Sequence, residues 1–314
     1  MAIANSAGAQ SQPTLWSKLS NPYLLLVLTV LFWGGNWVTG RAIRHSYSPI
    51  EIAFWRWLMA LGMFLPFAWP HMRAQAWVLF KEWKLLVTFG ILGSALFHTL
   101  VYTALAGTTA INATLVNSCM PVVIVAMSWV IFGERIGMRQ ALGILISLCG
   151  VVAIVSQGSL EVLLSVRFNP GDLWAIASVP VWALYSVLLR IRPPHVHPTA
   201  FLGSIMLVGV VALIPAYLWD SGIQIEPVPS WEALAGIVYM AVFASVLAYV
   251  FWNHAVAQVG ANKAGQFIHL LPVFGTLLAM IFLGEMLQGY HLLGIVLIVS
   301  GIVLATAKRL PGLG

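Results

Sequence analysis

The sequence predicts an all-α integral membrane protein, with ten transmembrane helices arranged as two inverted five-helix repeats. Three observations predict this fold: the composition, the number of long apolar runs, and an internal repeat. Of 314 residues, 61% are hydrophobic and 8% are charged, whereas about 25% of the residues in a soluble protein are charged. A helix that crosses the hydrocarbon core needs about 20 apolar residues, so ten such helices fill about 200 positions and leave only short connections.

The first five spans follow a polar N-terminal tail, residues 1–21. The apolar run after Ser20 is too long for the core of a signal peptide and has no cleavage pattern behind it, so we interpret it as the first span. The other boundaries lie where apolar runs meet Gly, Pro, Asn or charged residues. The expected spans of the first half are 22–43, 49–70, 83–106, 109–132 and 138–156.

The second five spans follow a linker over residues 157–171. This linker separates a first repeat, 22–156, from a second repeat, 172–307, and residues 308–314 form a C-terminal tail. Ten spans place both ends of the chain on the same side of the membrane. The expected spans of the second half are 172–191, 198–219, 231–257, 260–283 and 289–307.

The positions of Lys and Arg predict which side that is, because cytoplasmic loops are enriched in these residues. A cytoplasmic N-terminus leaves only Arg41, Arg44 and Arg167 outside. The net charge is +6, but the Lys and Arg residues form no basic cluster that would indicate nucleic-acid binding. Both termini are therefore expected in the cytoplasm. The basic residues on that side are Lys18, Arg73, Lys81, Lys84, Arg135, Arg139, Arg190, Arg192, Lys263, Lys308 and Arg309.

An internal repeat relates the two halves. A shift of 151 residues gives ten identities between residues 110–152 and 261–303, and a shift of 149 residues continues the match upstream. Because each half has an odd number of spans, the second half must enter the membrane upside down. Such inverted repeats allow one site to face either side of the membrane. Matched pairs include Trp33 with Trp182, Arg41 with Arg190, Pro49 with Pro198, Pro121 with Pro272, and Gly133-Glu134 with Gly284-Glu285.

Polar side chains at equivalent places in the two halves are the candidates for a substrate site. In span 3, Ser94, His98 and Tyr102 recur every four residues and share one helical face. Polar groups facing lipid are costly, so these stripes should either line a water-filled cavity or bond neighbouring helices. The equivalent stripe in span 8 is Ser245, Tyr249 and Asn253; the further candidates are Trp33, Asn36, Trp37, Asn112, Trp182, Tyr185 and Gln266.

Two basic residues have alternative interpretations. Lys263, at the edge of span 9, either holds a substrate carboxylate or is an ordinary cytoplasmic loop charge. Arg56 lies seven residues after Pro49, about 10 Å of helix rise from the outer end. It either extends outward to the interface or pairs with Glu51, or it has a gating or substrate role.

Three histidines are candidates for proton carriers, although a histidine among apolar neighbours is usually a hydrogen-bonded structural residue. They are His98, His254 and His269. No Asp or Glu lies deep in any span, which disfavours a carboxylate-based proton or sodium relay. The two cysteines, Cys119 and Cys149, fall within apolar runs and are expected to pack as small hydrophobic residues.

Glycine and proline residues suggest mechanical roles. Gly34, Gly35, Pro121, Pro180 and Pro272 are either bending points for a conformational change or static kinks that improve packing. Two glycine pairs, spaced by seven residues, are expected to permit close helix packing. These pairs are Gly143 with Gly150 and Gly294 with Gly301, and Glu134 and Glu285 are expected to be structural residues at opposite interfaces.

The motif Phe32-Trp33-Gly34-Gly35-Asn36-Trp37 and the repeated pattern of Pro, Gly-Glu, Gly and Gly resemble the drug/metabolite transporter superfamily with tandem EamA-type repeats. Within it, the chain looks closest to the YddG-type aromatic amino-acid exporters of bacterial inner membranes. The resemblance implies export of aromatic or large neutral amino acids, and some amphipathic drugs, by alternating access through a central cavity. It implies no cofactor and no metal. As an extension, we expect the substrate ring near Trp182, Tyr102 and His98.

Three other functions are considered. A broad drug exporter or a flippase of larger amphiphiles has the same architecture and differs in the compounds that compete. An intramembrane enzyme requires chemistry for which the sequence has no motif. A haem-bearing electron carrier needs two facing histidines, which His98 with His254 or His269 would permit.

Overall fold

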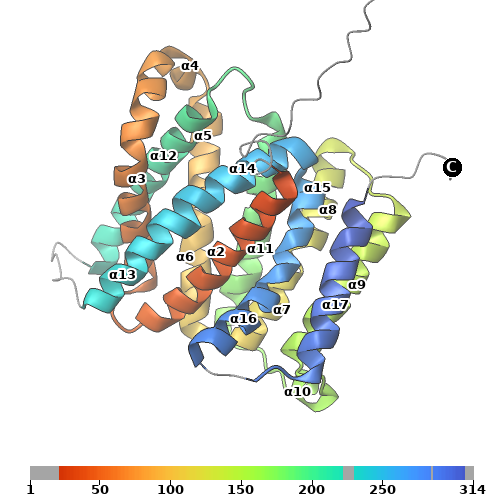
Figure 1. Cartoon of the computed structure of the whole chain (residues 1–314). Helices are drawn as coiled ribbons and strands as arrows, with labels where there is room; N and C mark the ends of the chain where they lie inside the picture. Colours follow the sequence, from red (N-terminus) through yellow and green to blue (C-terminus); the bar gives the residue numbers. More distant parts are fainter. Residues whose placement is uncertain (1–20, 222–229, 284–285, 308–314) are drawn as a thin grey trace, which may run out of the picture.

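The computed structural model describes residues 21–221, 230–283 and 286–307, and every regular element in this part is a helix. Figure 1 shows the helices packed into one bundle. The first half contains α2 (Pro22–Ile43), α3 (Pro49–Ala74), α4 (Ala76–Lys81), α5 (Trp83–Gly90), the π-helix η1 (Ile91–Leu96), α6 (Phe97–Gly107), α7 (Ala110–Ser118), α8 (Met120–Phe132) and α9 (Met138–Val155).

The connection and the second half repeat this order. The short helix α10 (Leu160–Leu164) lies in the connection. The second half contains α11 (Pro170–Leu188), the 3₁₀ helix η2 (Leu189–Ile191), α12 (Pro198–Ser221), α13 (Trp231–Tyr239), the π-helix η3 (Met240–Leu247), α14 (Ala248–Val259), α15 (Ala261–Ala264), the 3₁₀ helix η4 (Gly265–Leu270), α16 (Leu271–Leu283) and α17 (Gly289–Thr306).

Nine helices in the described residues are long and apolar enough to cross a membrane. They correspond to nine of the ten predicted spans. The remaining predicted span, 260–283, is divided into α15, η4 and α16. An all-helical membrane protein is thus confirmed, and the predicted span 260–283 contains the 3₁₀ turns of η4 at Gly265–Leu270. Interrupted helices of this kind are tolerated in a membrane where protein covers them.

The helix starts follow from local sequence. Proline occupies the first turn of α2, α3 and α11, where its missing N–H costs no helical hydrogen bond. Ser48 and Glu51 form a reciprocal capping box at the start of α3. Pro121 also lies in a first turn, because the helix breaks at Cys119 between α7 and α8. Pro121 therefore starts a new segment.

Contacts between loops group the connections at two ends of the bundle. At one end, Gln75 bonds the backbone of His195, and Glu134 bonds both Arg190 and Asn262. We call this end, which carries Arg73, Lys81, Lys84, Arg135, Arg139, Arg190, Arg192 and Lys263, the basic end. In Figure 1 it is marked by α4 and α15. At the opposite end, Ser48 bonds Asp220, Thr108 bonds Asp172, and Asn112 bonds the carbonyl of Arg167.

Helices α9 and α17 lie side by side and run in opposite directions (Figure 1). A Cβ at Gly143 would lie 2.5 Å from the carbonyl oxygen of Gly301, and one at Gly150 would lie 2.7 Å from that of Gly294. The two contacts are equivalents under the 151-residue shift. The prediction that these glycines permit close packing is confirmed, and the antiparallel contact shows that the two halves are inverted.

Helices α3 and α12 repeat this arrangement on the other side of the bundle. The rings of Phe54 and Tyr217 stack with centroids 4.2 Å apart. A Cβ at Gly203 would lie 2.6 Å from the Cβ of Ala68. Under the 149-residue shift, Phe54 corresponds to Gly203 and Ala68 corresponds to Tyr217, so the two contacts are equivalent. Between the two outer pairs, α2 packs on α14 and α6 packs on α11, which are again equivalent pairs. The centre of the molecule is therefore built from spans 1, 3, 6 and 8.

Candidate functional site

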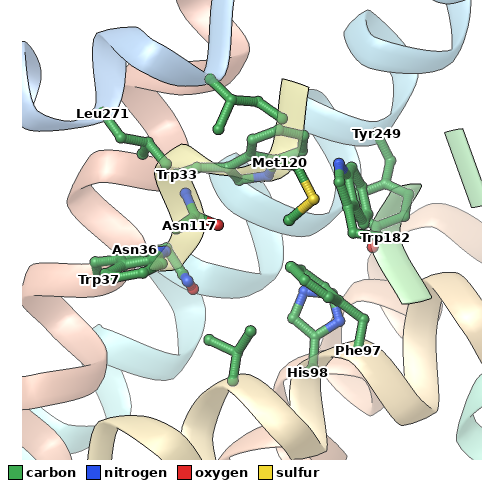
Figure 2. A pocket seen from close by; sticks show the side chains of 12 residues that line it. Trp33, Asn36, Trp37, Phe97, His98, Asn117, Met120, Trp182, Tyr249 and Leu271 are labelled. Carbon is green, nitrogen blue, oxygen red and sulfur yellow. The ribbon is translucent and has the colours of Figure 1, made fainter. Parts of the chain in front are cut away.

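A cavity lies at the centre of the bundle, between the two halves, and aromatic side chains surround it (Figure 2). Its free volume, the space open to the centre of a water molecule, is about 30 Å³. Six predicted site residues line it: Trp33, Asn36, Trp37, His98, Trp182 and Tyr249. The other lining residues are Phe97, Val101, Asn117, Met120, Ile268 and Leu271.

Trp182 is the centre of the aromatic cluster. Its ring meets that of Trp33 edge to face with centroids 5.0 Å apart, and Phe97 and Tyr249 lie 4.8 and 5.6 Å from it. Aromatic rings at such distances and angles attract one another beyond the effect of burial. The cluster joins α2 and α6 of the first half to α11 and α14 of the second. It forms one wall of the cavity and presents ring faces and edges to it (Figure 2).

The π-helices η1 and η3 lie at equivalent positions and each leaves a carbonyl oxygen free for a side chain. The N–H of Phe97 bonds the carbonyl of Leu92 instead of that of Gly93, its partner in a regular α-helix. In the same way, the N–H of Ala248 bonds the carbonyl of Phe243 instead of that of Ala244. Gly93 and Ala244 are themselves 151 residues apart. The hydroxyl of Tyr249 donates to the oxygen of Gly93, and the indole N–H of Trp33 donates to that of Ala244 at 3.3 Å. Short π-segments of this type are frequent at functional sites.

A tyrosine–asparagine hydrogen bond also occurs twice. The hydroxyl of Tyr102 donates to Oδ1 of Asn36 at 2.9 Å, and that of Tyr185 donates to Oδ1 of Asn253 at 2.9 Å. The repeat pairs Asn36 with Tyr185 and Tyr102 with Asn253, so the residue types are exchanged and the bond is preserved. These four residues, which the sequence singled out, bond helices across the centre of the molecule.

Arg56 is completely buried, with 0% of its surface exposed. Its Nε donates to Oγ of Ser245 at 2.5 Å, and its two Nη atoms donate to Asn36, Tyr102 and the carbonyl of Ala244. The interpretations in which Arg56 extends to the interface or pairs with Glu51 are therefore wrong. The guanidinium turns inward because the free carbonyl in η3 and the polar side chains of α2 and α6 supply its acceptors.

The remaining polar candidates lie away from the cavity lining. Ser94 is fully buried in η1, and Asn112 bonds Asp172 near the opposite end. Gln266 is fully buried in η4, where its amide nitrogen lies 3.4 Å from the carbonyl of Asn262. Lys263 lies in α15 at the basic end and is partly exposed. The structure thus brings the aromatic candidates together and places Lys263 at the basic end, outside the cavity lining.

The three histidines have different surroundings. His98 lines the cavity, and its Nδ1 lies 3.2 Å from the carbonyl of Ser94 and 3.3 Å from the indole nitrogen of Trp57. His269 is buried in η4 between Ser147 and the carbonyl of Ser118. His254 is exposed and bonds Gln258. Of the three, only His98 contributes to the cavity lining.

The cavity continues toward the opposite end of the bundle. A second hollow of about 170 Å³ shares Trp37, Asn117 and Leu271 with it and extends to Gly34, Pro272 and Arg41. A separate hollow of about 400 Å³ at the basic end is lined by Glu134 and Arg190, whose side chains form an ion pair. Gly34 and Pro272 thus border this second hollow, while Pro121 lies in the first turn of α8 and Pro180 lies inside α11.

A model of the EamA-like transporter family matches residues 20–156 and 169–307, one match in each half of the chain. The chain belongs to the EamA-like transporter family. It is 28% identical over 298 residues to the uncharacterized transporter YyaM of Bacillus subtilis, covering 94% of this chain and 96% of that protein. It is 30% identical over 303 residues to an uncharacterized transporter of Archaeoglobus fulgidus, covering 92% and 99% of the two chains. A solved crystal structure has the same fold, with a TM-score of 0.73 at 20% identity, covering 91% of this chain and 96% of that one.

This EamA-like transporter has lining residues that the sequence analysis missed. Phe97, Asn117, Met120 and Leu271 contribute to the cavity. Phe97 and Leu271 carried no signal, because apolar residues occur at every position of these spans. Asn117 is a polar residue within an apolar span, which is the property by which the other polar candidates were chosen, so the sequence could have identified it. Met120 is the first residue of α8, directly after the break at Cys119.

Proposed function

We propose that this EamA-like transporter exports aromatic or large neutral amino acids by alternating access through the central cavity. The observation that supports this proposal is the composition of the cavity wall, where Trp33, Trp37, Phe97, Trp182 and Tyr249 surround a few polar groups. Aromatic faces and edges bind an aromatic or apolar body, and a small number of polar groups fix its orientation. The resemblance of the sequence as a whole to YddG-type exporters favours the same substrate class.

The cavity as it stands has room for water molecules and not for an amino acid. Its free volume of about 30 Å³ exceeds the about 10–15 Å³ that one water needs by this measure. Substrate entry therefore requires the halves to separate around the cavity. The adjoining hollow of about 170 Å³, bordered by Gly34 and Pro272, supplies a path toward the opposite end. Gly34, Gly35, Pro121, Pro180 and Pro272 are the proposed bending points.

The proposed location is a bacterial inner membrane, with the basic end and both termini in the cytoplasm. The basic end carries eight Lys and Arg residues in the described part of the chain, against Arg41, Arg44 and Arg167 at the opposite end. Cytoplasmic loops have such an excess. In this orientation the hollow beside Arg41 faces outward.

A broad exporter of amphipathic drugs is the second candidate. The second hollow favours it, because Val38, Leu105 and Leu271 give it a largely apolar lining that suits a large apolar body. The two candidates differ in which compounds compete. An amino-acid exporter discriminates against compounds of similar size that lack the amino-acid group, whereas a drug exporter does not.

A counterflow experiment tests the proposal. The purified protein is reconstituted in proteoliposomes loaded with unlabelled phenylalanine, and uptake of labelled phenylalanine or tryptophan is followed with and without a pH gradient. Saturable uptake that unlabelled tryptophan inhibits and glutamate does not inhibit is expected. If no aromatic or large neutral amino acid gives saturable flux, the proposal is wrong. Inhibition by structurally unrelated amphipathic cations at equal strength favours the drug exporter.

A further inference from the structure

Arg56 is a completely buried charged side chain within a membrane-spanning helix, and no carboxylate among the described residues forms an ion pair with it. The ion pairs found in the described residues are Arg190 with Glu134 and His195 with Glu82. All acceptors of Arg56 are neutral: Ser245, Asn36, Tyr102 and the carbonyl of Ala244. A buried charge without a counter-ion is costly, and charged residues inside membrane proteins mark substrate or ion pathways.

The second half shows that the fold itself does not need this charge. The position equivalent to Arg56 under the 149-residue shift is Ile205, which is also fully buried. There the Tyr185–Asn253 bond forms at 2.9 Å, the same length as the Tyr102–Asn36 bond. The same pair of groups is therefore held together with an arginine hydrogen-bonded to both members in the first half, whereas no such bond is found among the described residues of the second half. The charge is a departure from symmetry that packing does not explain.

Arg56 reaches the cavity through Asn36. Both Nη1 of Arg56 and the hydroxyl of Tyr102 donate to Oδ1 of Asn36, at 3.1 and 2.9 Å. These two donors occupy the oxygen, so the NH₂ group is the part of the Asn36 side chain that remains for a ligand, and Asn36 is one of the residues that line the cavity (Figure 2). An amide donor with a guanidinium behind it forms a positive site, and a carboxylate is the complementary ligand.

Resting on the proposed function, we infer that the transported molecule carries a carboxylate and that Arg56 is the residue that selects it. The carboxylate binds the NH₂ group of Asn36, and Arg56 positions this amide and supplies the compensating charge. The aromatic body then lies against Trp33, Trp37 and Trp182, which line the same cavity. Specificity for a carboxylate thus comes from α3 of the first half. The competing assignment is Lys263, which lies at the basic end and outside the cavity lining.

The first experiment measures wild-type selectivity and needs no variant. Unlabelled phenylalanine, phenylalaninamide and 3-phenylpropionate are each tested as competitors of labelled phenylalanine uptake in the proteoliposomes. We expect the two carboxylates to compete about 10- to 100-fold better than the amide, the range for hydrogen bonds to charged groups. Equal competition by the amide overturns the inference, whether or not any variant folds. If labelled 3-phenylpropionate gives saturable flux while no amino acid is transported, the proposed function fails and the inference about Arg56 stands.

The second experiment identifies the residue. Arg56→Gln should raise the half-saturating concentration of phenylalanine about 10- to 100-fold and change that of phenylalaninamide less than about threefold. Arg56→Lys keeps the charge and should restore part of the selectivity. Arg73→Gln removes an exposed arginine from the end of the same helix and is the matched control, expected to change neither. Equal losses for both compounds in a folded Arg56→Gln protein, or a selective loss in Lys263→Gln instead, overturns the inference.

Discussion

At the residue scale, the aromatic lining is expected to determine affinity. Trp37 is partly buried and lines the central cavity and the hollow beside it. Trp37→Ala should raise KM for the aromatic substrate about 3- to 10-fold, the value of one aromatic contact, with a small effect on stability. Transport assays of both proteins at several substrate concentrations check this. Trp129→Ala is the control, because Trp129 is 56% exposed on the outer surface of α8; a similar rise in KM there would argue against the role of Trp37.

The repeated tyrosine–asparagine bonds are expected to stabilise the fold. Tyr185→Phe removes the donor to Asn253 and leaves a buried oxygen without its partner. The free energy of unfolding should fall by about 1–3 kcal/mol. Thermal unfolding in detergent measures the change. Tyr290→Phe is the comparison, since the contacts of Tyr290 are made by its ring with His291. If both variants unfold at the wild-type temperature, the bond contributes nothing to stability.

At the element scale, the crossing of α9 and α17 depends on glycine. Gly150→Ala and Gly301→Ala each place a methyl group within 2.7 Å of a backbone oxygen of the facing helix. Forcing an added methyl group into a packed contact costs about 1–3 kcal/mol. The melting temperature of each variant should therefore fall, and by similar amounts for the two halves. Fluorescence-detected unfolding measures it.

Gly62→Ala is the matched control for this crossing. Gly62 is exposed on α3, and an added Cβ meets no atom within 4 Å. Its melting temperature should equal or exceed that of the wild type, because alanine favours a helix over glycine. If Gly62→Ala is as destabilising as Gly150→Ala, the close approach of α9 and α17 is not the cause.

The elements also show what the sequence could and could not predict. The helical spans and the repeat were predictable because apolar length and matched Gly and Pro residues are local signals. The π-helices η1 and η3 were not, because one additional residue in a turn leaves no mark on an apolar sequence. The inward position of Arg56 was not predictable from the sequence either. Two of its acceptors, Ala244 and Ser245, lie in η3, almost 190 residues away in the chain.

At the scale of the whole molecule, the basic end is predicted to face the cytoplasm. In a protein without Cys119 and Cys149, His45→Cys and Ser165→Cys at the opposite end should react with an impermeant thiol reagent in intact cells. Lys84→Cys and Pro194→Cys at the basic end should react only after the membrane is opened. All four positions are exposed. Labelling of the basic-end positions in intact cells would show that the basic end faces outward and would contradict this prediction.

The central claim is that two inverted halves share one cavity that opens to either side. The most direct test is the accessibility of Asn117→Cys, in the same cysteine-free background, because Asn117 borders both the cavity and the hollow that leads to the opposite end. The rate of modification by an impermeant thiol reagent is measured from each face in right-side-out and inside-out vesicles, with and without substrate. The account predicts reaction from both faces, with substrate changing the two rates in opposite directions. Reaction from one face alone under every condition would contradict it.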